Sequence, residues 1–129
     1  MAHRSRLAGF IIDCEGGELG TAAAFWAAAL GMPVTDPDEG GGDKYAVLDA
    51  SARGLHVEVQ KVAHPPRVHL DIESDDIEAE AGRLIALGAR EIARPHGGRW
   101  IVLEAPTGHR FCVIRARQRL SGGNANVYD

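Results

Sequence analysis

The sequence predicts an α+β domain in which one strand–helix–strand–strand–strand pattern occurs twice. In each half, a strand with alternating apolar and polar residues precedes an amphipathic helix, which ends at Gly31 in the first half and at Gly88 in the second. Further strands separated by turn residues follow each helix, and the connector His64-Pro65-Pro66 divides the two halves. Two such modules can form a curved, cup-shaped mixed sheet with the helices on its outer face.

The first module covers about residues 7–63. Residues 7–14 alternate like a strand, and an apolar stripe at helical spacing predicts a helix that ends at Gly31. The stripe consists of Ala22, Phe25, Trp26, Ala29 and Leu30. A short edge strand is expected at 33–35, and the glycine-rich segment 36–43 is expected to be an exposed loop. Residues 44–49 and 55–62 are the remaining strands of this module.

The second module covers about residues 66–115. Residues 67–72 alternate strictly, and we expect the apolar side chains Val68, Leu70 and Ile72 to face the helix that begins near residue 75. A short strand at 91–93 and longer strands at 100–105 and 110–115 complete the pattern. The polar residues 1–6 are expected to form a flexible N-terminus. Residues 116–129 are expected to form a C-terminal tail that leaves the core, in which Val127 and Tyr128 could still dock on the domain.

Length and charge exclude several classes of protein. A chain of 129 residues is one ordinary domain, and its net charge of -4 without a basic stripe argues against a nucleic-acid partner. The longest apolar stretch, residues 21–30, is too short to span a membrane. The two cysteines form no C-x-x-C motif, which is typical of reduced thiols in a cytoplasmic protein.

Ionisable side chains occupy the strand faces opposite the apolar ones. Alternation places His56 with Glu58 on one strand, His69 with Asp71 on another, and Arg110 on the last strand. Trp100 and Glu104 share a face of the strand before it. Such faces border either solvent or a polar-lined cavity, and the carboxylates either form ion pairs or act chemically.

Three segments resemble the vicinal oxygen chelate superfamily, which includes the glyoxalase and bleomycin-resistance-like proteins. They are Phe25-Trp26 followed by Ala29-Leu30-Gly31, the strand 67–72 with its helix to Leu87-Gly88-Ala89, and the stretch from Trp100 through Ala105-Pro106-Thr107-Gly108 to Val113. Together they cover roughly residues 7–115. The resemblance implies a small-molecule ligand bound in the cup between the two modules, and a homodimer.

The resemblance also implies where a metal would bind. The four ligand positions of metal-dependent members correspond here to Gly9, His56, His69 and Arg110. His56 and His69 could bind zinc, nickel, iron or manganese, since neutral imidazole is a good ligand for such ions. Gly9 offers no side chain, and the guanidinium of Arg110 repels a cation. The alternatives are therefore no metal cofactor, or a divalent ion on the two histidines, for which Glu58 or Asp71, two positions further along the same strand faces, could supply a third ligand.

Three hypotheses of function follow. The first is a metal-free protein that binds an anionic or aromatic molecule in a cup lined by His56, Asp71, His69, Trp100, Glu104 and Arg110. The second is a lyase, isomerase or dioxygenase that uses His56 and His69 on a metal, or His69 with Glu58 or Asp71 as a metal-free acid–base pair. The third is a regulatory or structural dimer with a vestigial cup.

Overall fold

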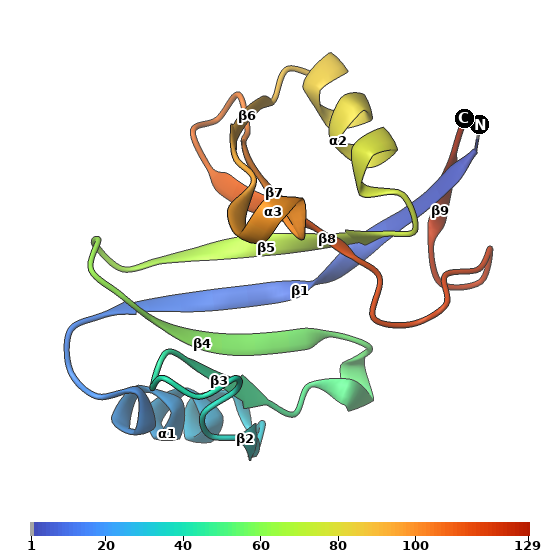
Figure 1. The fold of residues 1–129 in the computed structure, drawn as a ribbon. Coiled ribbons are helices and arrows are strands. Elements are labelled where there is room, and N and C mark those ends of the chain that lie inside the picture. The colour runs from blue at the N-terminus through green and yellow to red at the C-terminus, as the bar shows by residue number, and fades with distance from the viewer. Residues whose placement is uncertain (1) are drawn as a thin grey trace. The chain divides into compact units, whose positions relative to one another are not determined.

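The computed structural model describes residues 2–129, which form two compact units. Unit 2 consists of Gly9–His69; unit 1 consists of Leu70–Asp129 together with the residues up to Ala8. The elements are, in chain order, β1 (His3–Glu15), α1 (Leu19–Leu30), β2 (Val34–Asp36), β3 (Tyr45–Leu48), the 3-10 helix η1 (Ser51–Arg53), β4 (His56–Val62), β5 (Arg67–Ser74), α2 (Ile77–Ala86), β6 (Arg90–Ala93), α3 (Pro95–Gly98), β7 (Trp100–Glu104), β8 (Arg110–Arg115) and β9 (Asn126–Tyr128) (Figure 1). The predicted α+β fold of two βαβββ modules is confirmed.

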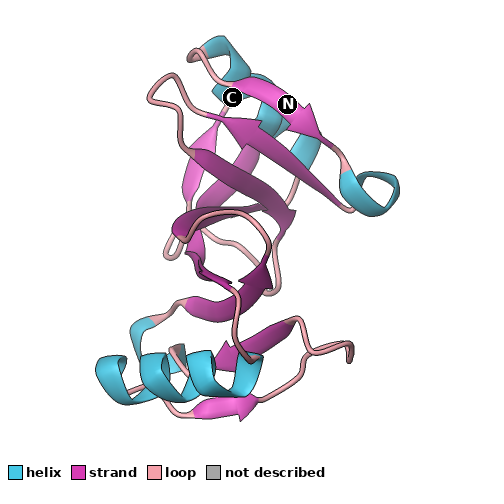
Figure 2. Ribbon diagram, turned by 90° about the vertical axis from the view of Figure 1, so that its left-hand side faces the viewer, coloured by secondary structure: helices cyan, strands magenta, loops and turns pink. Residues whose placement is uncertain are grey.

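In unit 2 the strands follow the order β2-β3-β4-β1. β1 runs parallel to β4, and the other pairs are antiparallel, so the sheet is mixed as expected. The apolar side chains of β3 and β4 pack against Leu19 and Ala23 of α1. Figure 2 shows α1 as the long helix at the bottom, beside these strands. The hydrophobic core of unit 2 therefore lies between the helix and one face of its sheet.

In unit 1 the strands follow the order β5-β8-β7-β6, and β5 runs parallel to β8. α2 begins where the Asp76 carboxylate accepts a hydrogen bond from the backbone N–H of Ala79. Its buried residues Ile77 and Ala81 pack on Ile101, Leu103 and Val113. In the parallel pair of β5 and β8, Leu70 lies opposite Phe111, just as Phe10 lies opposite Val57 in the parallel pair of β1 and β4. The two modules thus repeat each other in strand register as well as in element order.

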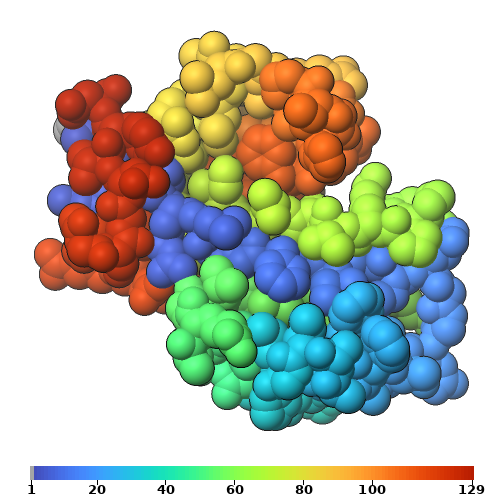
Figure 3. All heavy atoms as spheres, turned by 180° about the vertical axis from the view of Figure 1, so that it is seen from behind, coloured from blue at the N-terminus to red at the C-terminus, as the bar shows by residue number. Residues whose placement is uncertain are grey.

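Both ends of the chain contribute strands that the sequence did not predict. β1 starts at His3, so residues 3–6 belong to the sheet rather than to a flexible arm. β9 pairs with this first part of β1, and the Tyr128 ring lies 3.7 Å from the Arg83 guanidinium. In Figure 3 the C-terminal residues, in red, lie against the N-terminal residues, in dark blue. The tail from residue 116 is therefore attached to unit 1 and not detached from it.

Three apolar residues expected in the core are exposed. Val68 is 55% exposed, Leu70 50% and Phe25 61%. The reason for Phe25 is that α1 turns Leu19 and Ala23 toward the sheet, which leaves Phe25 to pack edge-on against Trp26. Alternation groups Val68 and Leu70 on one face of β5, but within residues 2–129 neither side chain belongs to the apolar sets that form the cores beside α1 and α2. Within the described residues, no helix is both long and apolar enough to cross a membrane.

Candidate functional site

The sheet face of unit 2 that is turned away from α1 carries a group of polar side chains. Val57 and Val59 face α1, so His56, Glu58 and Gln60 point to the opposite side of β4. The register of β1 places Asp13 beside Gln60. We call the following set the polar face of unit 2: Asp13, Tyr45, His56, Glu58, Gln60 and His69. Gln60 is fixed there by a hydrogen bond from its Nε2 to the Tyr45 hydroxyl, at 3.1 Å.

Asp13 is the most connected member of this face. Its side chain is buried, and its Oδ2 lies 3.0 Å from His69 Nδ1, 3.7 Å from Arg67 Nε and 3.8 Å from His64 Nε2. An ionised carboxylate only accepts hydrogen bonds, so His69 donates from Nδ1 and its tautomer is set by Asp13. The other oxygen, Oδ1, is buried and accepts no hydrogen bond within residues 2–129. Asp13 thus orients the imidazole of His69, which is one of the candidate site residues predicted from the sequence.

Asp13 was not among the candidate site residues that the sequence predicted. It lies 56 positions before His69, and the register that brings them together is a property of the folded sheet. The only local signal was a carboxylate inside the apolar run Phe10-Ile11-Ile12-Asp13-Cys14. Because a buried carboxylate needs partners, a carboxylate in such a run is a stronger candidate for a site residue than an exposed aspartate is.

His56 and Glu58 form the second cluster on the polar face of unit 2. His56 Nε2 lies 3.4 Å from Glu58 Oε2, and the Glu58 side chain is nearly buried. Glu39 joins them from the glycine-rich loop, with ligand atoms of all three residues within 4.8 Å of one another. Glu58, proposed from sequence as a base or a metal ligand, lies beside His56. Glu39 was not predicted, because the loop gave no sign of where it would fold.

In unit 1 the predicted site residues lie on the sheet face turned away from α2. Glu104 pairs with Arg110 across β7 and β8, and the Arg110 Nε lies 3.4 Å from Glu104 Oε2. Arg90 holds the other Glu104 oxygen at 2.9 Å. The hydrogen bond from Arg90, opposed by partial desolvation and reinforced by Arg110, lowers the pKa of Glu104. Trp100 shares this face and has the His96 ring 4.9 Å from its own. Glu104 is thus an ion-paired residue.

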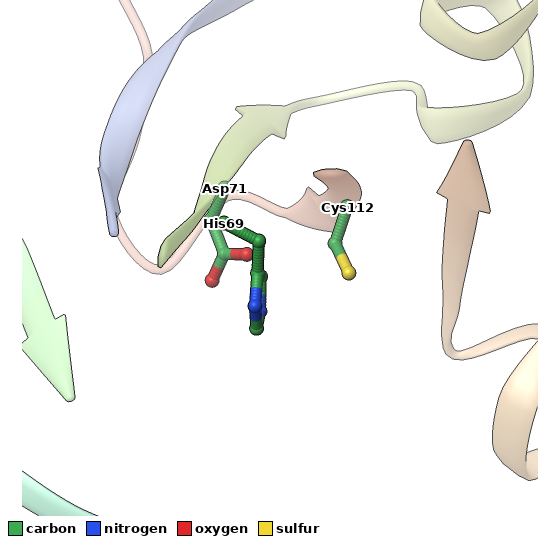
Figure 4. A group of neighbouring side chains, drawn as sticks. All are labelled: His69, Asp71 and Cys112. Atoms are coloured by element: carbon green, nitrogen blue, oxygen red, sulfur yellow. The ribbon is translucent and has the colours of Figure 1, made fainter. Parts of the chain in front are cut away.

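Asp71 completes the predicted set and lies beside Cys112. The two residues are opposite each other in the parallel pair of β5 and β8, and Asp71 is buried. Figure 4 shows Asp71 and His69 on β5, two residues apart, and the Cys112 thiol on β8. Neither Cys112 nor Cys14 forms a disulfide bond within the described residues. Burial raises the pKa of the Cys14 thiol, which favours the inert small residue expected at that position.

The family's metal does not fit its four ligand positions in this chain. A Cβ built on Gly9 would collide with the backbone carbonyl of His56, so β4 occupies the space that a ligand side chain would need. Arg110, at another of the four positions, is a permanent cation engaged by Glu104. A catalytic zinc site requires about three protein ligands. Only His56 and His69 of the four family positions can coordinate an ion, so we derive no chemistry from a metal there.

Comparisons with known proteins agree with the fold. A family model for the glyoxalase-like domain matches residues 9–114. A hypothetical protein from Bacillus halodurans is 14% identical, with a TM-score of 0.64 over 92% of this chain and 99% of that one. Methylmalonyl-CoA epimerase from Mycobacterium tuberculosis is 15% identical, with a TM-score of 0.61 over 87% of this chain and 90% of that one. No curated protein sequence matches the chain significantly.

The two structural neighbours are less than 25% identical to the chain, so they support the fold and not an activity. The family match spans both modules, and the repeated βαβββ register supports it independently. On this evidence of sequence and fold, the chain belongs to the glyoxalase-like family of the vicinal oxygen chelate superfamily.

Proposed function

We propose that the chain binds a small anionic or aromatic molecule on the sheet faces that are turned away from α1 and α2, without the complete metal site of the family. The observation that carries this proposal is the cation Arg110 at a position where metal-dependent members place a ligand. A guanidinium attracts carboxylates and phosphates through a planar set of N–H donors. The proposed ligand therefore carries an acidic group.

The surroundings of Arg110 support a flat anionic ligand. Glu104 contacts the Nε of Arg110, and the Arg110 side chain keeps 39% of its surface exposed. Arg90 balances the charge of Glu104, so the group of two arginines and one glutamate has net positive charge. Trp100 lies on the same face of β7 but four residues before Glu104, so only a ligand that extends about 13 Å along the strand from Arg110 would also stack on its ring.

A ligand screen tests the proposal. Aromatic carboxylates, aliphatic carboxylates and phosphates are added in the presence of chelator, and thermal unfolding is measured. A ligand at one hundred times its dissociation constant stabilises a protein by about 2.7 kcal/mol, which such a screen detects. We expect aromatic anions to raise the unfolding temperature. Substituting Arg110→Gln should weaken the best ligand at least about tenfold, as expected for a charge-assisted contact, and the exposed control Arg99→Gln should not.

Two results would contradict this proposal. One is a screen in which no anion shifts the unfolding temperature of the unaltered chain. The other is equal affinity of the chain and of its Arg110→Gln variant for the same anion. In either case the positive charge at residue 110 does not serve ligand binding.

A second candidate function is a lyase, isomerase or dioxygenase activity, and the Asp13–His69 pair favours it. An imidazole held in one tautomer by a buried carboxylate is suited to general acid–base catalysis. Methylglyoxal–glutathione adducts, catechols and epoxide antibiotics are the substrates to assay, with and without metal. We expect His69→Ala to abolish turnover. The predicted catalytic roles would be contradicted if the His69→Ala variant or the Glu58→Gln variant were as active as the unaltered chain.

We also propose that the chain forms a homodimer in the cytoplasm. A hollow of about 380 Å³ in unit 2 is lined by the apolar residues Ile12, Trp26 and Val68, among others, and by the charged residues Asp13, Glu15 and Arg67. Phe25 and Val68 are exposed apolar side chains of the same unit, and such surfaces often form protein contacts. Light scattering of the purified protein measures its mass. A monomer at micromolar concentration would contradict the dimer.

A further inference from the structure

Three ligand-type side chains of unit 2 converge from two segments of the chain. Glu39, His56 and Glu58 each offer one nitrogen or oxygen atom, and these atoms lie within 4.8 Å of one another. His56 and Glu58 come from the same face of β4, and Glu39 comes from the loop between β2 and β3. Only His56 belongs to the ligand positions of the family, so this is a different set of residues.

The loop is built to hold Glu39 in place. The backbone N–H of Glu39 donates to the carbonyl of Tyr45 at 2.8 Å, which ties the loop to the start of β3. The Asp38 carboxylate accepts a hydrogen bond from the backbone N–H of Asp43 at 2.8 Å, across the three glycines. β3 is the neighbour of β4, with Val47 opposite Glu58. The glycine-rich segment is therefore folded back on the strand beside the histidine.

The histidine nitrogen at the centre of the group is buried without a hydrogen bond. His56 Nε2 has no hydrogen-bond partner within residues 2–129, although Glu58 Oε2 is only 3.4 Å away. Buried polar atoms nearly always have partners, so an orphan of this kind indicates a missing water or ion. Two ligands bound at about 2.1 Å in a tetrahedral site lie about 3.4 Å apart. The separation of this nitrogen and oxygen is that of two atoms on one ion.

We propose that Glu39, His56 and Glu58 form a binding site for a divalent first-row transition metal ion within unit 2. One imidazole and two carboxylates are ligands suited to manganese, iron, nickel or zinc. Three protein ligands leave coordination positions open for water or for a ligand.

This site goes beyond the proposed function and is independent of it. Anion binding through Arg110 requires no metal, and the metal site requires neither Arg110 nor His69. The two proposals are therefore tested by different variants and in different buffers. A chain that binds anions in chelator but binds no metal contradicts only the metal site, and the reverse result contradicts only the anion site.

Metal titration tests the site without any assumption about activity. Chelator-treated protein is titrated with zinc, nickel or manganese chloride, and heat of binding and unfolding temperature are measured. Cobalt(II) serves as a spectroscopic probe, because its visible absorption reports the coordination geometry. We expect one ion per chain for at least one of these metals. Glu39→Gln should weaken it at least about tenfold, because second carboxylate ligands contribute strongly to affinity for divalent ions.

Control variants identify the ligand set. The exposed Glu15→Gln, in the same unit, should bind the ion as the unaltered chain does. His69→Gln should also leave binding unchanged, while His56→Gln should remove it. If Glu39→Gln binds as tightly as the unaltered chain, or if His69→Gln loses the ion, the three-residue site is wrong and the ion lies elsewhere. Circular dichroism of each variant confirms that it is folded.

Discussion

The two modules share one fold and one strand register, but they use their buried carboxylates differently. In unit 1, Glu80 is fully buried and accepts hydrogen bonds from Arg83, from His3 and from the Ser5 hydroxyl, all at 2.8 Å. In unit 2, Asp13 is almost as deeply buried, yet its nearest partner is His69, and one of its oxygens accepts no hydrogen bond within residues 2–129.

This difference separates structural charges from candidate functional ones. When an arginine and two further donors satisfy a buried carboxylate, that carboxylate adds conformational specificity and holds segments of the chain together. A buried carboxylate that mainly orients an imidazole leaves polar capacity for something outside the protein. Glu80 holds the N-terminal part of β1 on α2, whereas Asp13 and Glu58 belong to the polar face of unit 2. Buried charge alone therefore does not identify the site; the partners of the charge do.

The largest expected effect comes from removing the structural carboxylate. Glu80→Ala leaves Arg83 and His3 without their common partner, and breaking a buried ion pair typically costs about 3–5 kcal/mol. Urea unfolding measures the free energy. The matched control is Glu78→Ala on the same helix; Glu78 forms an exposed bidentate ion pair with Arg94, so this substitution should destabilise the chain clearly less than Glu80→Ala does. If the two substitutions lowered the free energy of unfolding equally, the structural role of Glu80 would be contradicted.

Lowering the pH sharpens the same comparison. Burial alone raises the pKa of Glu80, but the hydrogen bonds from Arg83, His3 and Ser5 outweigh it, so the pKa lies below its ordinary value. The resulting stabilisation is complete above the pKa of an unfolded glutamate, about 4.3, and disappears as the pH falls through the lowered folded value. The difference in stability between the chain and its Glu80→Gln variant should therefore shrink from pH 7 to pH 3. A constant difference would show that the charge is not its origin.

Strand alternation predicted which side chains share a face, because the two-residue period is a local property of the backbone. It placed Val57 and Val59 against α1 and His56 and Glu58 opposite, and the structure agrees. It could not tell whether a helix covers a face, and so it placed Val68 in the core although that residue is exposed. The local pattern thus determines which way a side chain points, whereas its burial depends on segments that are distant in the sequence.

Contacts between distant positions were the part that one sequence could not supply. The N-terminal residues were expected to be loose because His3 and Ser5 are polar, but their partner Glu80 is 75 or more positions away. Asp13 and His69 meet only because of the sheet register, and Glu39 reaches His56 only because its loop folds back on β3. Residue types and their faces were predictable for the candidate site, whereas the pairing within it was not.

The next prediction tests the strand register of unit 2. Gly9→Ala places a methyl group against the carbonyl of His56, which neither backbone can easily avoid, and overpacking typically costs about 1–3 kcal/mol. The control is Gly20→Ala in α1, where nothing lies within 4 Å of the added carbon and the helix gains about 0.5–1 kcal/mol. Thermal and urea unfolding compare the two. A Gly9→Ala variant as stable as the unaltered chain would contradict the close approach of β1 and β4.

Substitution of Asp13 is expected to affect the site more than the fold. Asp13→Asn keeps the size of the side chain but removes the charged acceptor of His69, at a cost of about 1–3 kcal/mol. Nitrogen NMR of the imidazole should show His69 protonated on Nδ1 in the unaltered chain and a mixture of tautomers in the variant. The same single tautomer in both proteins would mean that Asp13 does not orient the ring.

The smallest effect concerns the C-terminal strand. The Tyr128 ring covers the Arg83 guanidinium, and a cation–π contact at a partly exposed site contributes about 0.5–1 kcal/mol. Tyr128→Leu keeps an apolar side chain on β9 but removes the π face, so it should destabilise the chain by about that amount. Val127→Ala, on the exposed side of the same strand, is the control. A neutral Tyr128→Leu variant, together with a costly Glu80→Ala, would contradict this prediction. It would show that Arg83 is held by Glu80 alone and that the Tyr128 ring adds no stability to the ion pair of Arg83 with Glu80.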